Sequence, residues 1–279
     1  MKKFALLTGS IISALVVIGC NDFPFEEDWM QRLLIESMKN NNNTRPIDTS
    51  KNVIIPVPTS CECVLKGAIV CLPFYNGSAE DVSGNGNHGK IAGAVPTADR
   101  FGNPNSALLF DGKDDYVIVE KLQGAVPGNT PKTISGWFNS SKPGKYLQML
   151  FGFGTYATPN NFQIGTGPTT SMDDKFQFRV NGWGDSYDWR TGIPSGTYFD
   201  GKWHHCAVTY DGEITKVYFD GTLAASTDKF KYVTPEVSSL VIGREIDLVE
   251  WEFEGALDDI RIFDWAIDGQ YIAQLYNEK

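Results

Sequence analysis

From residue 53 onward, apolar and polar side chains alternate in short segments that are separated by glycine, asparagine and aspartate. Segments of this kind, rich in β-branched and aromatic residues, are typical of half-buried strands. Asp-Gly pairs at 211–212 and 220–221 are signals for tight hairpin turns. The pattern predicts strands over 67–74, 106–110, 116–119, 133–138, 162–164, 175–180, 203–210, 215–219, 239–243 and 257–263.

Helical periodicity is confined to a short stretch at the end of this region, residues 268–276. No long amphipathic helices alternate with the strands, which argues against an α/β fold. Aromatic residues make up 13% of the chain and there are 28 glycines, a composition that suits many strands joined by tight turns. We therefore expect an all-β, two-sheet antiparallel sandwich.

Several motifs then occur in a characteristic order. They are LPFYNGSAEDVSGNGNHG (72–89), DRFG (99–102), ALLFDGKDDY (107–116), ISGW (134–137), WHHCAVTYDG (203–212), VYFDG (217–221) and GALDDIRIF (255–263). This series resembles the laminin-G-like, concanavalin A-type jelly-roll domains, over about residues 67–279. The resemblance implies a jelly-roll sandwich. Together with the strand pattern that begins at residue 53, it places the domain at 53–279.

The first residues have the layout of a secretory signal. Lys2 and Lys3 precede an apolar stretch over 4–18 that is shorter than a membrane-spanning helix needs to be. The sequence Val-Ile-Gly-Cys at 17–20 resembles the lipobox of bacterial lipoproteins, which implies removal of residues 1–19 and lipidation of Cys20. The alternative is an ordinary cleaved signal followed by an incidental cysteine.

Residues 20–52 differ from the domain that follows. Asp22 is placed to cap a helix opening at Pro24, and four asparagines at 40–43 end it. We expect a lipid-anchored helix and linker, with docking of the helix on the domain or a partner as the alternative. The expected location is the bacterial cell envelope, lipid-anchored at the outer membrane on its surface or periplasmic face.

The charge balance restricts the partners. The formal net charge of −10 becomes −12 without residues 1–19, which carry two lysines and no acidic residue. Nucleic acids and anionic lipid surfaces attract basic patches, so neither is expected as a partner. We expect the membrane to be reached through the lipid anchor only.

Four further cysteines are present, Cys61, Cys63, Cys71 and Cys206. Export permits disulfides, and the three possible pairings of four cysteines stay open. Cys206 lies in an alternating strand pattern and is equally compatible with a small buried side chain.

The glycine-rich turn at 81–87 is a candidate calcium site. Asp81, Asn85 and Asn87 offer the oxygen ligands that calcium prefers. The family resemblance implies a structural calcium ion held by Asp81, Asn87 and Asp258 or Asp259. The alternative is that these side chains only hydrogen-bond their own turn.

The segment Glu245-Ile-Asp-Leu-Val-Glu250 resembles the catalytic strand of retaining glucanases. That resemblance implies Glu245 as nucleophile, Asp247 as helper and Glu250 as general acid. Only about thirty residues follow Glu250, and the flanking motifs place 245–252 between strands. We therefore keep glycoside hydrolysis as an alternative and expect no catalysis. The histidines add no site, because His204 and His205 point to opposite faces of one strand.

Sugar sites combine aromatic rings with polar side chains. Trp183, Tyr187, Trp189 and Arg190 fall in a glycine-rich, non-alternating stretch and are the predicted ligand-binding residues, with Tyr156, Asn160 and Trp251 as possible additions. Their alternative role is a small apolar cluster under a long loop. Trp137 and Trp203 lie within strand patterns and are predicted to be core.

These observations favour an exported, membrane-anchored module that binds a glycan or a glycosylated protein. A protein-binding adhesion module without sugar binding and a glycoside hydrolase are the alternatives. The same fold hosts all three activities, so the fold does not choose among them.

Overall fold

The computed structural model describes residues 67–124, 126–141, 147–155, 161–168, 176–181, 188–246 and 251–278. All of them belong to the compact unit Gly67–Lys279. The predicted signal, Cys20, Cys61, Cys63 and the linker lie outside the described residues. Within the described part of the chain, no helix is long and apolar enough to cross a membrane.

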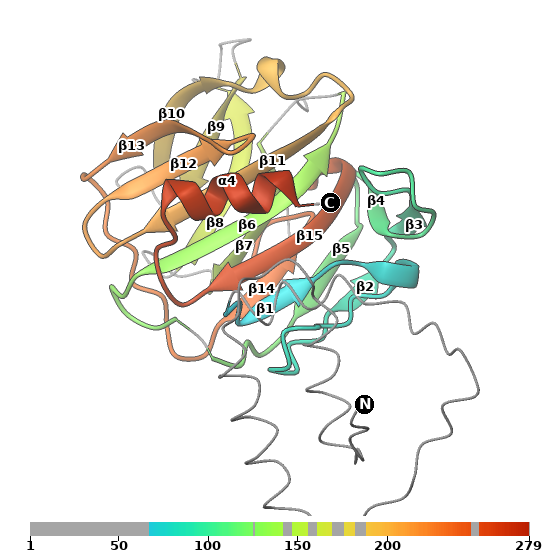
Figure 1. Cartoon of the computed structure of the whole chain (residues 1–279), viewed down its shortest axis with the longest axis horizontal. Helices are drawn as coiled ribbons and strands as arrows, with labels where there is room; N and C mark the ends of the chain where they lie inside the picture. The colour runs from blue at the N-terminus through green and yellow to red at the C-terminus, as the bar shows by residue number, and fades with distance from the viewer. Residues whose placement is uncertain are drawn as a thin grey trace, which may run out of the picture. The chain divides into compact units, whose positions relative to one another are not determined.

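Two antiparallel sheets make up the domain (Figure 1). The larger sheet has the order β13-β12-β11-β6-β15-β4-β3, and β1 also pairs with β15. Its strands are β1 (Val70–Leu72), β3 (Val95–Thr97), β4 (Ala107–Asp111), β6 (Lys132–Asn139), β11 (Trp203–Tyr210), β12 (Thr215–Phe219), β13 (Thr222–Thr227) and β15 (Glu254–Phe263).

The seven-stranded sheet has the order β10-β9-β8-β7-β14-β5-β2. Its strands are β2 (Lys90–Ala92), β5 (Tyr116–Val119), β7 (Gln148–Gly154), β8 (Asn161–Pro168), β9 (Phe176–Asn181), β10 (Asp188–Pro194) and β14 (Ser239–Ile242). Short 3₁₀ turns lie at Tyr75–Gly77 (η1) and Ser195–Thr197 (η2).

The core lies between the two sheets and follows from the alternation of each strand. In β11, Cys206, Val208 and Tyr210 belong to the main apolar cluster, while Ala207 belongs to a second cluster. Successive strand residues point to opposite faces, so the second cluster lies on the outer face of the larger sheet. The two-sheet jelly-roll sandwich predicted from the sequence is confirmed.

The helix α4 (Gly269–Asn277) covers this second cluster. Asp268 caps its first turn by accepting a hydrogen bond from the backbone N–H of Tyr271, and Ile272 and Leu275 are its buried residues. Figure 1 shows α4 lying across the larger sheet near β11 and β12. The helix predicted over 268–276 is therefore confirmed, within one residue at each end.

The most central strand that the pattern did not predict is β7. All seven of its residues are buried, because one face meets the core and the other is also covered. A strand buried on both faces shows no apolar–polar alternation. The edge strands β2, β3, β10 and β13 were also missed, because many of their residues are exposed and no apolar run marks them.

The cysteines divide into two kinds. Cys206 is a free, fully buried thiol within the main core. Cys71 is disulfide-bonded. Cys206 therefore fills the role of a small buried side chain, one of the two roles that its strand position allowed.

Candidate functional site

A row of five paired residues crosses the outer face of the larger sheet, beside the part that α4 covers. Cross-strand pairing runs from Val95 to Leu109, then to Ala256, Asn139 and Trp203. Directly paired residues point to the same face of a sheet. Five strands, from β3 near residue 95 to β15 near residue 260, thus contribute to one surface.

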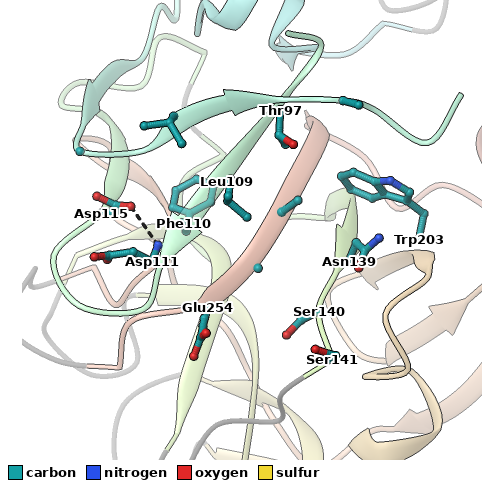
Figure 2. Close-up of a pocket in the computed structure, with 15 residues that line it drawn as sticks. Thr97, Leu109, Phe110, Asp111, Asp115, Asn139, Ser140, Ser141, Trp203 and Glu254 are labelled. Carbon is teal, nitrogen blue, oxygen red and sulfur yellow. Dashed lines mark hydrogen bonds between the residues drawn. The ribbon is translucent and has the colours of Figure 1, made fainter. Parts of the chain in front are cut away.

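This row forms the floor and one wall of an open pocket of about 720 Å³ (Figure 2). Small-molecule sites commonly have volumes of about 300–1,000 Å³. The lining residues are Gly93, Val95, Thr97, Ala98, Leu109, Phe110, Asp111, Asp115, Asn139, Ser140, Ser141, Trp203, Glu254, Gly255 and Ala256.

One end of the pocket carries an aromatic ring and neutral polar groups. Trp203, at the start of β11, lies beside Asn139, and Ser140 and Ser141 follow at the end of β6 (Figure 2). The backbone at Gly255 passes close to this end: a Cβ there would lie 2.5 Å from the Asn139 carbonyl oxygen and 2.8 Å from the Ser140 Cβ. A side chain at Gly255 is therefore excluded.

The other end of the pocket is acidic, with Asp111, Asp115 and Glu254 around it (Figure 2). Asp111 and Glu254 are direct cross-strand partners. The Asp115 carboxylate accepts a hydrogen bond of 2.9 Å from the Asp111 backbone N–H. Burial raises the pKa of Asp115 above its usual value, and the charges of Asp111 and Asp114 raise it further.

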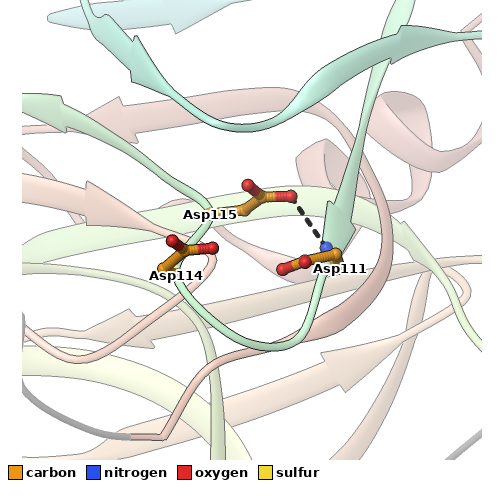
Figure 3. A group of neighbouring side chains, drawn as sticks. All are labelled: Asp111, Asp114 and Asp115. Atoms are coloured by element: carbon orange, nitrogen blue, oxygen red, sulfur yellow. Dashed lines mark hydrogen bonds between the residues drawn. The ribbon is translucent and has the colours of Figure 1, made fainter.

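Within the described residues, one group of three carboxylates lies close enough to share a metal ion, Asp111, Asp114 and Asp115 (Figure 3). Their ligand oxygens all lie within 4.8 Å of one another. Carboxylate oxygens are the hard ligands that calcium prefers, so the donor type fits. Lys113 offers a competing cation, since its Nζ lies 3.4 Å from the Asp111 carboxylate.

The predicted calcium ligand Asp81 has protein partners for both carboxylate oxygens. Oδ1 accepts hydrogen bonds from the backbone N–H groups of Cys71 and Ser83, at 2.9 and 3.0 Å. Oδ2 accepts from the Ser83 hydroxyl and the Asn87 N–H, both at 2.8 Å. Asn87 in turn donates to the Ile69 and Gln123 carbonyl oxygens.

Asp258 and Asp259 pair with arginines. Arg100 Nη1 lies 3.1 Å from Asp258, and Arg261 donates two hydrogen bonds to Asp259, at 3.0 and 2.8 Å. Burial opposes ionisation of Asp259, but Arg261 and Arg100 hold its pKa below the usual value. The structure does not gather Asp81, Asp258 and Asp259 into one group. Calcium at this set stays a prediction, and the contacts favour turn stabilisation.

Of the four predicted sugar-binding residues, the structure describes two, Trp189 and Arg190. Trp183 and Tyr187, like Tyr156 and Asn160, lie outside the described residues. Trp189 packs partly buried against the main core, whereas its neighbour Arg190 is exposed. Both lie in β10, so their side chains point to opposite faces of the sheet. A shared site for the four residues therefore stays a prediction.

The predicted catalytic alternative gains no support from the described residues. Glu245 is 3% exposed, and Asp247 and Glu250 lie outside the described chain.

Trp203 corrects a sequence-based expectation. It was predicted to be core, but it is half-buried and forms the wall of the pocket. The alternation of side chains along β11 indicates this position. Cys206, Val208 and Tyr210 face the core, so Trp203, an odd number of residues away, faces the outer side of the sheet. Trp137 is buried as predicted, but on the outer face, between the Arg100 guanidinium at 4.6 Å and the stacked ring of Tyr276.

The two stacked sheets and their strand order define a jelly-roll protein of the concanavalin A type. The family model described as the concanavalin A-like lectin/glucanases superfamily matches residues 111–273. The chain belongs to this superfamily.

Solved structures of similar fold include three with distinct functions. Domain 4 of AbnA, an extracellular arabinanase from Geobacillus stearothermophilus solved with arabinotriose, has a TM-score of 0.57 and 21% identity, covering 76% of this chain and 98% of that one. The botulinum neurotoxin serotype D binding domain has a TM-score of 0.53 and 15% identity, and the match covers 75% of this chain and 51% of that one. Trypanosoma rangeli sialidase with the inhibitor DANA has a TM-score of 0.52 and 18% identity, and the match covers 74% of this chain and 32% of that one.

At these identities the likeness concerns the fold alone. This chain spans about half of the toxin binding domain and a third of the sialidase. A search of curated proteins gives no match.

Proposed function

We propose that this protein is a glycan-binding module without catalytic activity, and that the pocket beside Trp203 is its binding site. The observation that supports this most is the pairing of an exposed apolar floor with polar groups at both ends. Leu109 is 42% exposed and Val95 51% exposed, which leaves apolar surface open to a ligand. Sugars have apolar C–H faces and polar rims, and the floor and ends of the pocket match these two parts.

The fold relatives lend support at a coarser level. One was solved with arabinotriose and another with a sialidase inhibitor, so related folds act in carbohydrate-active proteins.

The test is a glycan array followed by calorimetric titration of any ligand found. Trp203→Ala is expected to weaken binding about tenfold or more, equivalent to about 1.4 kcal/mol. Trp265→Ala is the matched control, because Trp265 is 37% exposed and does not line the pocket. It should leave the affinity unchanged.

Trp183→Ala separates this site from the one predicted on the sequence. A loss confined to Trp183→Ala would move the site to the Trp183–Arg190 segment. No glycan binding by the unaltered protein would contradict the proposal and favour a protein-binding adhesion module. Polysaccharide degradation that disappears in Glu250→Gln would establish the hydrolase instead.

We also propose that the protein is exported and anchored in the outer membrane through lipid on Cys20. The lipobox resemblance at 17–20 supports this. Metabolic labelling with a palmitate analogue should label the protein and fail to label Cys20→Ser. Equal recovery of both forms in the membrane fraction would contradict the anchor.

A structural calcium ion remains part of the proposal, because the family resemblance implies it. The donor type at Asp111, Asp114 and Asp115 is compatible with calcium. Unfolding midpoints with calcium and with chelator test for this ion, and the variants Asp81→Ala and Asp114→Asn distinguish its two candidate places.

A further inference from the structure

The floor of the pocket beside Trp203 is a row that crosses the strands of the larger sheet instead of running along one of them. Its members are direct cross-strand partners on five strands, namely Val95, Leu109, Ala256, Asn139 and Trp203. Neighbouring strands lie about 4.8 Å apart, so the row has a length of about 19 Å. One sugar ring covers about one strand spacing. The floor is therefore longer than a single sugar needs.

The row offers apolar contact at both of its ends. Val95 and Leu109 are 51% and 42% exposed, and Trp203 is half-buried at the opposite end. Figure 2 shows Leu109 and Trp203 on opposite sides of β15, with Asn139 next to Trp203. Sugar rings present C–H groups on their faces, which pack against apolar and aromatic side chains. Well-separated side chains of the row therefore suit different rings of one chain.

Polar side chains flank the row on both of its long sides. Thr97 is paired with Ala107, which precedes Leu109 by two residues, whereas Asp111 follows Leu109 by two residues. Thr97 and Asp111 thus lie on opposite sides of the row, and both line the pocket. Sugar hydroxyls project from the edges of the ring, so a sugar chain that lies on the row places hydroxyls beside both residues.

No paired strand closes either end of the row within the part of the chain that the structure describes. Strand β3, which carries Val95, is the last strand in the order of its sheet. At the other end, β12 pairs with β11 over residues 206–210 and ends before it reaches Trp203. A ligand chain that follows the row therefore meets no further strand at either end.

We infer that the pocket binds an internal stretch of a linear glycan, about four sugar units long, which crosses the strands from β3 to β11. This inference rests on the proposed function, because it assigns the ligand class of the same pocket. One ring stacks on Trp203, and the rings farther along the chain contact Leu109 and then Val95. Their hydroxyls meet Asn139 and Thr97. Monosaccharides occupy only part of the row and bind weakly.

The first test is calorimetric titration with linear neutral oligosaccharides of increasing length. The probes are β-1,4-linked glucose, β-1,3-linked glucose, α-1,5-linked arabinose and any linear glycan found on the array, each as chains of two to six units. In a series that binds, the affinity should rise about tenfold or more from the dimer to the tetramer, because each added ring buries further apolar surface. It should change little beyond the pentamer. Equal affinities for dimer and tetramer would overturn the inference and leave the proposed function standing.

Variants along the row separate the ring that stacks from the rings that extend the contact. Trp203→Ala should weaken the dimer and the hexamer by a similar factor. The double variant Leu109→Ser with Val95→Thr should keep the dimer affinity and lose the gain with length, with its unfolding midpoint as a check on folding. Leu223→Ser with Val237→Thr is the matched control, because these residues are 50% and 61% exposed and do not line the pocket. A gain with length that the Leu109 and Val95 double variant retains would overturn the inference.

The number of protein molecules bound per chain distinguishes internal from terminal recognition. A long linear polysaccharide should bind several molecules, in a ratio that grows with chain length, because each internal stretch is a site. Converting the reducing end of the hexamer to an alkyl glycoside should leave its affinity unchanged. One molecule per chain at every length, or loss of binding on capping, would assign the pocket to a chain end and overturn the inference. Binding of no glycan at all would contradict both this inference and the proposed function.

Discussion

The Nδ1 atom of His204 lies 2.8 Å from the Oδ2 atom of Asp220, which ends the β12 side of a hairpin turn. Its Nε2 atom lies 3.1 Å from the Asp200 carboxylate. The hydrogen bond to Asp220 raises the pKa of His204 above its usual value of 6.5, although partial burial opposes the rise. The protonated His204 ring thus links the loop that contains Asp200 to the turn that contains Asp220.

A raised pKa in the folded state predicts a pH-dependent contribution to stability. The contribution is fully present below the unfolded pKa of 6.5 and is lost as the pH rises through the folded pKa. His204→Gln should therefore lower the free energy of unfolding by about 1 kcal/mol in mild acid, and by less in alkali. Urea unfolding at about pH 5.5 and 8.5 measures this. Equal losses at both values would exclude a charged His204.

For Lys132 we expect the opposite dependence of stability on pH. Its buried Nζ donates hydrogen bonds to the Gly128 carbonyl and the Thr234 hydroxyl, at 2.8 and 2.9 Å. Burial lowers its pKa from 10.5 to about 8. Between these values the unfolded chain binds a proton that the folded chain releases, so stability rises with pH. Urea unfolding should show this rise over the range, relative to Lys132→Met. Parallel pH profiles for the two proteins would contradict the lowered pKa.

Asp81→Ala tests whether the turn needs calcium. The substitution leaves four donors without their acceptor, and we expect a loss of about 3 kcal/mol in unfolding free energy. Thermal and urea unfolding, each with calcium and with chelator, should show the same loss. A loss seen only with calcium present would instead make Asp81 an ion ligand.

The exposed Asp114 provides the comparison for that experiment. Asp114→Asn should not change stability in chelator. A calcium-dependent rise in the midpoint that disappears in Asp114→Asn would place the ion at Asp111, Asp114 and Asp115. No calcium dependence in the unaltered protein would remove the ion from the proposal.

Cys206 is expected to be chemically silent in the folded protein. Burial raises the pKa of its thiol, and the side chain is fully enclosed. Thiol reagents require an accessible thiolate, so the folded protein and Cys206→Ala should react to the same extent. Cys206→Ser should cost about 1–3 kcal/mol, because it places a hydroxyl in an apolar core. Reagent uptake by the folded protein that Cys206→Ala abolishes would contradict the enclosed position.

Much of the fold was predictable because strand formation depends on local pattern. The alternation in β11 and β15 and the Asp-Gly turn after β12 are visible in the sequence, and the structure confirms both strands. Strand β7 was not predictable in the same way. Its two covered faces depend on neighbours that are distant in sequence, so no alternation marks it.

The pocket itself was not predicted from the sequence. The residues from Trp183 to Arg190 are predicted to bind sugar because they interrupt a strand pattern, whereas Trp203 lies within one. Asp111 and Glu254 gave no joint signal, since only the pairing of β4 with β15 makes them neighbours.

The sequence by itself determined the two-sheet class, the buried faces of most strands, the final helix and the order of family motifs. These depend on side-chain periodicity and turn chemistry, which act over a few residues. Only the tertiary structure decided that Val95, Leu109, Ala256, Asn139 and Trp203 form one row, and that acidic residues close one end of it. Strand register across a sheet is fixed by packing between distant segments, so the site exists only once the sheet has formed.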